Sequence, residues 1–322
     1  MVYQIVFYGI LVVLTVFLST KLGFYVDQID KKSNLSSAFI GGVLLAAVTS
    51  LPELFTSISS VVLVEKPALV LGNILGSNLF NSMVLGLVFL LYGKHVVKKR
   101  LVGSHLVSLR SVLLIFAMLL FPLFLEKSPS VLSVSVYSLV ILAVYLISFR
   151  SMSQDENAAE DDDLPCPLTL RQIAVRFVFS AGCLIAVSIL LTYASDTLGA
   201  ALGFGATAAG ALLLGVVTSL PELISCFVLA KARNFNAVTG NIVGSNLFNF
   251  LILVVADICA PRQELYQFDP TARLLVWLGL AGTLSFSVLL TLHRNKTSGK
   301  VSFGVCCAIP LVCYGIFAVF GT

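Results

Sequence analysis

Thr-Ser-Leu-Pro-Glu-Leu, at residues 49–54, is repeated without a change at residues 218–223, and each copy places a glutamate inside an apolar run. A second block, Gly-Asn-Ile-Leu-Gly-Ser-Asn-Leu-Phe-Asn at residues 72–81, returns at residues 240–249 with one difference. The displacements are 169 and 168 residues, so both blocks belong to one duplicated unit. Duplicated apolar segments interrupted by glycine and proline are typical of transporters whose ion site lies between two related halves.

The composition places the chain in a membrane. Of its 322 residues, 58% are hydrophobic and only 11% are charged, with a mean hydropathy of +1.01, whereas soluble domains have about 25% charged residues. Ten apolar stretches are long enough to cross the hydrocarbon core, for which a helix needs about 20 residues. They lie near residues 3–20, 37–63, 68–92, 102–125, 130–149, 172–194, 204–230, 237–259, 272–292 and 301–320. We therefore predict an all-α integral membrane protein.

The basic residues predict how the chain is oriented. With the N-terminus outside, the inside connections hold 14 Lys and Arg residues and the outside connections hold four, which are Lys66, Lys127, Arg262 and Arg273. The positive-inside rule therefore favours both termini outside, in a multi-pass protein that we place in the inner cell membrane. Five spans separate equivalent segments, an odd number, so the two halves cross in opposite directions and the repeat is inverted.

The two halves meet at the longest polar stretch of the chain. We expect a first five-helix repeat at residues 1–150, with its repeated blocks within about 39–90, and a second at residues 171–322, with its blocks within about 208–258. Residues 151–170 form an acidic linker on the cytoplasmic side. The linker lacks the glycine and the final glutamate of a calcium-binding EF-hand loop, so we interpret it as a solvated connection.

Glu53 and Glu222 are the acidic residues that lie in the middle of a predicted span. A carboxylate at the centre of a membrane helix costs at least about 2.5–3.5 kcal/mol, so two in mirrored positions indicate a function. Pro52 and Pro221 each remove a backbone donor next to a glutamate. Carbonyls freed in this way are tolerated where they line protein or a water-filled cavity. Broken helices in both halves therefore predict a shared polar cavity at mid-membrane.

Oxygen-bearing side chains accompany both glutamates, namely Thr49, Ser50, Ser77 and Asn81 in the first half and Thr218, Ser219, Ser245 and Asn249 in the second. The serine and asparagine of the second block are spaced i, i+4 and share a helix face. Neither block contains a thiol or an imidazole, and Ca²⁺ prefers such an all-oxygen set. Two carboxylates balance one divalent cation or two monovalent ones. Asn73 and Asn241 suit backbone capping as well as ion binding, and amides at this spacing also pack helices.

At these residues the chain resembles the cation/Ca²⁺ antiporter superfamily, specifically its prokaryotic sodium/calcium exchanger-like members, with both repeat patterns present twice. The resemblance implies ten helices in two inverted five-helix repeats, with broken helices at the ion site. It implies that Ca²⁺ binds centrally to Glu53, Glu222, Asn81, Asn249, Thr49 and Thr218. It also implies flanking Na⁺ sites formed by Ser50, Ser77, Ser219 and Ser245 with carbonyls near Ala46 and Gly215.

The resemblance implies a secondary antiporter that exchanges Ca²⁺ for Na⁺ by alternating access, with the bundle of spans 1 and 6 moving against the rest. One position departs from the family pattern. Many sodium-coupled relatives carry an aspartate at one of the two positions that Asn81 and Asn249 occupy here. With two acids rather than three, the coupling ion is open. H⁺-coupled Ca²⁺ exchange is an alternative on the same fold, because protons compete for two close carboxylates. K⁺-dependent Ca²⁺ exchange is another alternative on this fold.

Other classes of function have weaker support. A passive cation channel needs a continuous pore, and an intramembrane enzyme needs a Ser/Lys, paired-Asp or His-metal constellation, which the spans lack. The chain also lacks a phosphate-binding Gly-x₄-Gly-Lys-Ser/Thr loop, so an ATP-driven cycle is not expected. We expect a protein that is not an enzyme and holds no cofactor. Its partners are the lipid bilayer and inorganic cations, with neither nucleic acid nor an obligatory protein partner.

Overall fold

The fold is known from a computed structural model, which describes residues 1–32, 45–97, 103–124, 129–131, 133–152, 168–260, 264–295 and 299–321. The first half contains α1 (Val2–Lys32), α3 (Leu45–Thr49), α4 (Leu51–Val62), α5 (Pro67–Leu91), α6 (Gly93–Val96), α7 (Ser104–Met118), the short η2 (Phe121–Phe124) and α8 (Val136–Met152). The second half contains α9 (Leu170–Leu202), α10 (Ala206–Ala209), η3 (Gly210–Gly215), α11 (Val216–Thr218), α12 (Leu220–Lys231), α13 (Phe235–Cys259), α14 (Pro270–Arg294) and α15 (Lys300–Phe320).

The predicted membrane architecture is confirmed. Within the described ranges, seven helices are long and apolar enough to cross a membrane, and a bent pair, Ala206–Thr218 with Leu220–Lys231, adds an eighth span. The shorter apolar helices α4 and α8 occupy the second and fifth predicted spans. Residues 37–44 of the second predicted span and residues 153–167 of the predicted linker lie outside the described residues.

Several predicted boundaries differ from the structure. Helix α1, expected to end near residue 20, continues to Lys32. The fifth span was expected from residue 130, but residues 130–135 form a hairpin of β1 (Ser130–Val131) and β2 (Val134–Ser135), in which Ser133 has a positive φ of 66°. Helix α9 extends eight residues beyond the expected end of the sixth span. It begins at a capping box formed by Thr169 and Gln172, and it ends where Gly203 takes the left-handed conformation that glycine tolerates best.

The helices of the two repeats are broken in the same way. Ser50 has φ −91° and ψ 12°, Ser219 has φ −91° and ψ 4°, and in each repeat a proline then occupies the first turn of the next helix. Proline is tolerated there because the first turn has no partner for its missing N–H. Helix α12 bends by 41° from the preceding segment at this break. The end of each broken helix is marked by a second shared feature, the positive φ values of Glu65 and Arg233.

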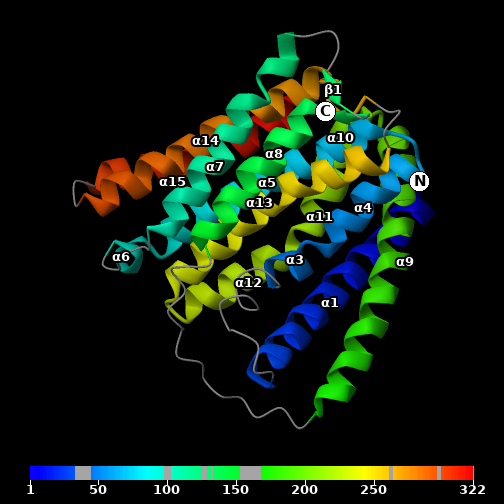
Figure 1. The fold of residues 1–322 in the computed structure, drawn as a ribbon, viewed down its shortest axis with the longest axis horizontal. Helices are drawn as coiled ribbons and strands as arrows, with labels where there is room; N and C mark the ends of the chain where they lie inside the picture. Colours follow the sequence, from blue (N-terminus) through cyan, green and yellow to red (C-terminus); the bar gives the residue numbers. More distant parts are fainter. Residues whose placement is uncertain are drawn as a thin grey trace.

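The repeats meet along α5 and η3 at the centre of the bundle (Figure 1). A Cβ atom on Gly72 would lie 2.0 Å from the carbonyl oxygen of Thr207, and one on Gly215 would lie 2.8 Å from that of Asn73. Glycine at these two positions therefore lets the backbones of opposite repeats touch. The segment η3 is a π-helix, a widened turn that is frequent at functional sites.

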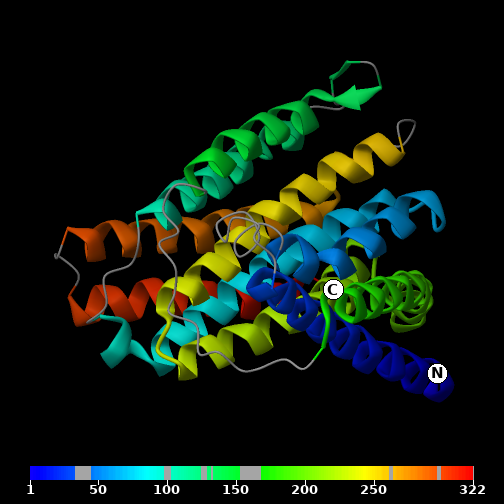
Figure 2. The same ribbon diagram turned by 60° about the horizontal axis from the view of Figure 1, so that its bottom comes forward.

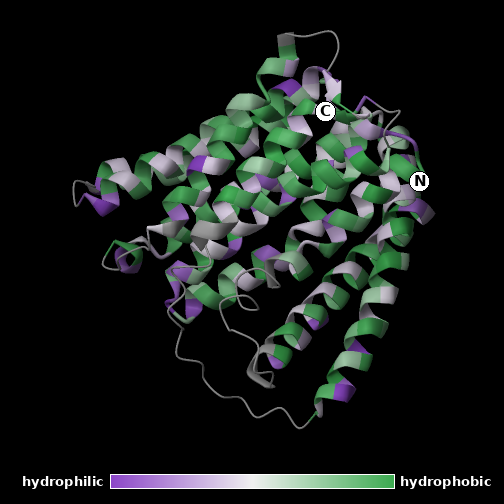
Figure 3. Ribbon diagram, in the orientation of Figure 1, coloured by the Kyte–Doolittle hydropathy of each residue, from purple (hydrophilic) through white to green (hydrophobic). Residues whose placement is uncertain are grey.

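Helices α1 and α9 lie side by side at one edge of the bundle in both ribbon views (Figures 1 and 2). Hydrophobic residues make up most of both helices (Figure 3), and few residues of these two spans are buried inside the protein. Helices α5 and α13 are far more deeply buried. The α1–α9 pair is therefore a peripheral element packed against a core that contains the repeated sequence blocks.

Candidate functional site

Glu53 and Glu222 occupy the first turns of α4 and α12, and both are buried, with exposed fractions of 1% and 0%. The partial positive charge at a helix N-terminus favours a carboxylate in the first turn. The break before each proline therefore does two things. It ends the preceding helix, and it presents a new helix N-terminus to the glutamate.

The two carboxylates are held together by hydroxyl groups of the opposite repeat. Ser219 Oγ donates a hydrogen bond of 3.2 Å to Glu53 Oε1, and Thr218 is a second partner of this carboxylate. Thr49 contributes in the same way to Glu222. Ser219 precedes Glu222 by three residues, less than one helical turn, so the residue that bonds to Glu53 lies in the turn before Glu222. The structure therefore brings the two predicted acids into one site.

Several oxygen atoms in this site are buried and have no hydrogen-bond partner. Among the described residues they are Ser50 Oγ, Glu53 Oε2, Asn81 Oδ1, Glu222 Oε2 and Asn249 Oδ1. An unpaired buried polar group costs about 1–3 kcal/mol, and more when it is charged. Two of these five oxygens belong to the carboxylates themselves and three to neutral side chains. Together they have the chemistry of a cation site, because a cation satisfies acceptors that no protein donor reaches.

Asn81 and Asn249 lie on the core helices α5 and α13, and each bonds to an asparagine of the opposite repeat. Asn81 Nδ2 donates to Asn246 Oδ1 at 3.0 Å, and Asn249 Nδ2 donates to Asn78 Oδ1 at 2.9 Å. Asn78 and Asn246 were not among the predicted site residues, although their place beside the serine of each block put them one position from the predicted stripe. The structure makes them neighbours of two predicted ligands.

The two serines of the second block, Ser77 and Ser245, donate to different acceptors. Ser245 Oγ donates to Glu222 Oε1 at 3.5 Å, whereas its counterpart Ser77 donates to the Gly215 carbonyl at 3.1 Å. That carbonyl closes the π-helix η3. Ala46, the counterpart of Gly215, lies in the short helix α3. The predicted flanking residues therefore surround the same two breaks in the backbone.

Asn73 and Asn241 differ although their sequence blocks match. Asn73 is fully buried, and its Nδ2 donates to Thr56 Oγ1 at 3.0 Å, to Ser57 Oγ at 3.0 Å and to the Glu53 carbonyl at 3.3 Å. Asn241 is partly exposed and donates to Cys226 Sγ at 3.6 Å. The second repeat replaces the hydroxyl of Ser57 by a thiol at this position, so its amide has a weaker partner.

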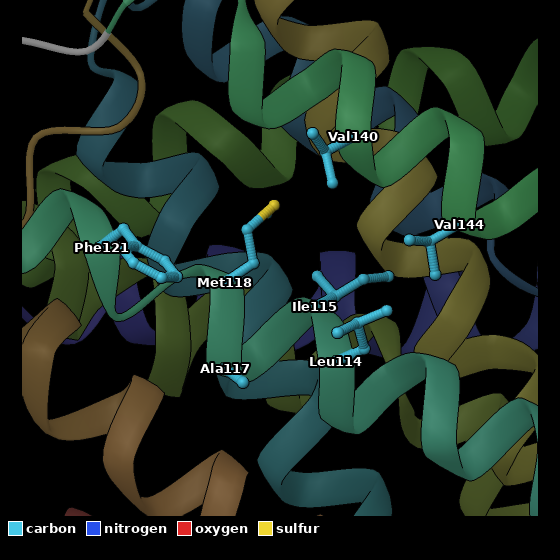
Figure 4. A pocket seen from close by; sticks show the side chains of 7 residues that line it. All are labelled: Leu114, Ile115, Ala117, Met118, Phe121, Val140 and Val144. Atoms are coloured by element: carbon cyan, nitrogen blue, oxygen red, sulfur yellow. The ribbon is translucent and has the colours of Figure 1, made fainter.

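Two further observations concern other places where an ion could bind. Within the part of the chain that the structure describes, no three His, Cys, Asp or Glu side chains gather as a metal-binding group. A cavity of about 290 Å³ lies between α7 and α8, but its lining is apolar (Figure 4) and includes Met118, Phe121 and Val140. That cavity offers an ion no ligand, and the buried oxygens around the glutamates do.

The chain and its fold are similar to those of known proteins. The family model described as "Sodium/calcium exchanger protein" matches residues 3–150 and 173–322. The protein described as "Putative antiporter CaxA" from Alkalimonas amylolytica is 29% identical over 259 residues, which cover 77% of this chain and 78% of that protein. The fold also matches two solved exchangers at low sequence identity. For the H⁺/Ca²⁺ exchanger CAX the TM-score is 0.70 at 16% identity, covering 98% of this chain and 88% of that one. For the sodium-calcium exchanger NCX_Mj it is 0.62 at 20% identity, covering 99% of both.

Proposed function

The chain belongs to the sodium/calcium exchanger family of membrane transporters, and we propose that it exchanges Ca²⁺ for Na⁺ by alternating access. The observation that carries this proposal is the pair of buried carboxylates, Glu53 and Glu222, surrounded by buried oxygens without hydrogen-bond partners. Ca²⁺ takes six to eight oxygen ligands, and two carboxylates balance its charge. The same two charges balance two Na⁺ ions, so one site can serve competing cargoes in turn.

Neutral oxygens next to each carboxylate support Na⁺ as the counter-ion. Ser219 adjoins Glu53, Ser245 adjoins Glu222, and the free Ser50 hydroxyl lies at the first break. A hydroxyl or carbonyl shared with one carboxylate suits a monovalent ion, because it adds ligands without adding charge. In this proposal Ca²⁺ binds to Glu53, Glu222, Asn81, Asn249, Thr49 and Thr218. Na⁺ binds to Ser50, Ser77, Ser219 and Ser245 and to the carbonyls of Ala46 and Gly215.

Alternating access is supported by a difference between the two ends of the bundle. We define the Lys66 face as residues 63–66 with residues 193–196, and the Arg233 face as residues 232–234. Figures 1 and 2 show the α4–α5 turn of the first face and the α12–α13 turn of the second at opposite ends of the bundle. Asn73, on the Lys66 side of the site, is fully buried, whereas its counterpart Asn241, on the Arg233 side, is partly exposed.

Polar contacts between the α1–α9 pair and the core strengthen this difference. Tyr8 Oη donates to the Leu213 carbonyl at 2.6 Å, Tyr193 Oη donates to the Leu63 carbonyl at 3.4 Å, and Lys66 forms an ion pair with Asp196. Each of these contacts lies in the half of the pair nearest the Lys66 face. We therefore propose that this conformation is closed at the Lys66 face and opens toward the Arg233 face.

Placement in the membrane follows from the charges of the connections. Lys231 and Arg233 belong to the basic set that the positive-inside rule assigns to the cytoplasm. In this proposal the Arg233 face is cytoplasmic, the Lys66 face and both termini lie outside, and the protein resides in the cell membrane. The cytoplasmic linker separates two five-helix repeats at residues 1–150 and 171–322.

Exchange of Ca²⁺ for H⁺ is the second candidate, and one observation favours it. Asn81 and Asn249 are both amides, so the six residues proposed to bind Ca²⁺ include two acids, Glu53 and Glu222. Two protons neutralise this pair as fully as one Ca²⁺ does. Flux of ⁴⁵Ca²⁺ into proteoliposomes separates the candidates. An imposed Na⁺ gradient at clamped pH drives Ca²⁺ movement under the first proposal, and only a pH gradient drives it under the second. Ca²⁺ movement that follows neither gradient contradicts antiport with either ion.

A further inference from the structure

The Asn78–Asn246 pair makes the same hydrogen bond in both directions. Asn78 Nδ2 donates to the Asn246 carbonyl at 3.3 Å, and Asn246 Nδ2 donates to the Asn78 carbonyl at 3.3 Å. Both side chains are buried, and they lie where α5 crosses α13. A backbone carbonyl can only accept a hydrogen bond. These two bonds therefore determine which end of each amide is the NH₂ group and which is the oxygen.

The orientation passes from this pair to the predicted ligands. With its NH₂ group on a backbone carbonyl, Asn78 turns its Oδ1 toward Asn249 and accepts from Asn249 Nδ2 at 2.9 Å. In the same way Asn246 Oδ1 accepts from Asn81 Nδ2 at 3.0 Å. An amide that donates through nitrogen on one side presents oxygen on the other. Asn81 Oδ1 and Asn249 Oδ1 are both buried and without a hydrogen-bond partner.

We propose that Asn78 and Asn246 are positioning residues that turn the side-chain oxygens of Asn249 and Asn81 toward the transported cation. This inference rests on the proposed function, because it assigns the free oxygens to Ca²⁺ coordination. If either ligand amide rotated by half a turn, two oxygens would face each other and an NH₂ group would point at a cation. We call Asn78, Asn249, Asn246 and Asn81 the amide relay, and its hydrogen bonds exclude that arrangement.

The relay also accounts for the amides at both ligand positions. An ionised aspartate at position 81 or 249 has no proton to donate to Asn246 Oδ1 or Asn78 Oδ1, so two acceptors would meet in a buried place. The relay therefore selects asparagine at both positions and leaves Glu53 and Glu222 as the only charged ligands.

Each positioning residue contacts a ligand of the opposite repeat, Asn78 with Asn249 and Asn246 with Asn81, and variants of these pairs test the proposal. The full-length protein is studied in proteoliposomes, with the KM for Ca²⁺ as one readout. The Ca²⁺-dependent rise of the melting temperature in detergent is the second readout and measures binding without transport. Loss of an outer partner of a metal ligand typically lowers metal affinity about 10–100-fold. We expect Asn78→Leu and Asn246→Leu to raise the KM by that factor and to weaken the Ca²⁺-dependent stabilisation.

Double-mutant cycles with alanine separate positioning from general packing. The effects of Asn78→Ala and Asn249→Ala on KM should be non-additive, and those of Asn78→Ala and Asn81→Ala should be closer to additive. Leu79→Ala removes a buried apolar side chain between these residues, so it should lower the melting temperature and leave the KM unchanged. Equal coupling in both cycles, or a KM change in Leu79→Ala as large as in Asn78→Leu, would overturn the proposal.

Glu53→Gln distinguishes this failure from failure of the proposed function. If Glu53→Gln abolishes Ca²⁺ flux while the asparagine variants keep the normal KM, the positioning role alone is wrong. If Glu53→Gln leaves the flux intact, the cation site itself is wrong, and the relay then has no ligand to orient.

Discussion

Lys66 Nζ lies 2.6 Å from Asp196 Oδ1 and 2.7 Å from Oδ2, so a two-pronged ion pair joins the α4–α5 turn of the core to α9 of the peripheral pair. Both side chains are partly exposed, at 46% and 21%, and exposed ion pairs contribute about 0.2–1 kcal/mol. In the proposed alternating-access cycle this contact must break once per turnover, and a contribution of that size suits such a contact. It would favour the proposed closed state of the Lys66 face without locking it.

Lys66→Ala should therefore open the Lys66 face more often. Loss of about 1 kcal/mol changes the ratio of two states about fivefold. Hydrogen-exchange mass spectrometry should show faster exchange in α4 and in residues 193–202. Lys231→Ala removes an exposed lysine near the opposite face and should leave these peptides unchanged. The charge-swapped double variant Lys66→Asp with Asp196→Lys should restore slow exchange, and unchanged exchange in Lys66→Ala would exclude a role in closure.

Glu53→Gln and Glu222→Gln should each lower Ca²⁺ flux in proteoliposomes by at least about 100-fold. Glutamine keeps the shape of the side chain but removes a charge that the divalent cation needs, and several kcal/mol of electrostatic energy are lost at a buried site. Glu264→Gln is the matched control, because Glu264 is exposed and far along the chain from the breaks. Normal flux in both buried variants would show that Ca²⁺ does not depend on this site.

Gly72→Ala should destabilise the core. The added Cβ would lie 2.0 Å from the Thr207 carbonyl oxygen and 2.9 Å from the Ala211 nitrogen, both backbone atoms of the opposite repeat. Overpacking of this kind costs about 1–3 kcal/mol, so the melting temperature in detergent should fall by several degrees. Gly182→Ala in α9 meets nothing within 4 Å, and its better helix propensity should keep or raise the melting temperature. Equal melting temperatures would mean that the repeats pack less closely than the structure shows.

Asp257→Leu should lower stability without changing the KM for Ca²⁺. Asp257 is buried, and its Oδ2 accepts hydrogen bonds from the Ser135 backbone N–H at 2.8 Å and from Ser138 Oγ at 2.7 Å. It thus links the end of α13 to the start of α8 in the other repeat. Hydrogen bonds to charged groups contribute about 1.5–3 kcal/mol. The position is occupied by Phe89 in the first repeat, so this acid is no part of the duplicated unit. An altered KM alongside normal stability would instead assign Asp257 to the ion path.

Much of the fold could be predicted from local patterns. Long apolar stretches predicted the membrane helices, and the residues before Pro52 and Pro221 break their helices as a missing backbone donor requires. The hairpin before α8 and the full lengths of α1 and α9 were not predicted. The hairpin occupies residues apolar enough to extend a span, and α9 continues past Asp196, which finds its partner 130 residues away.

The predicted site residues illustrate the same division. The i, i+4 spacing placed Ser77 with Asn81 and Ser245 with Asn249 on one helix face, yet it could not distinguish Ser245, which donates to Glu222, from Ser77, which donates to the Gly215 carbonyl. It also did not predict the contacts of Asn78 and Asn246, which lie one position from this face and bond to residues of the opposite repeat.

The sequence alone determined that two duplicated, proline-broken segments place two glutamates among oxygen-bearing side chains in a membrane, because periodicity and hydrophobicity act within a single helix. Only the tertiary structure decided that Ser219 serves Glu53, that Asn78 serves Asn249 and that Lys66 meets Asp196. Each of these contacts joins two helices, and the face that one helix presents to another depends on how all of them pack.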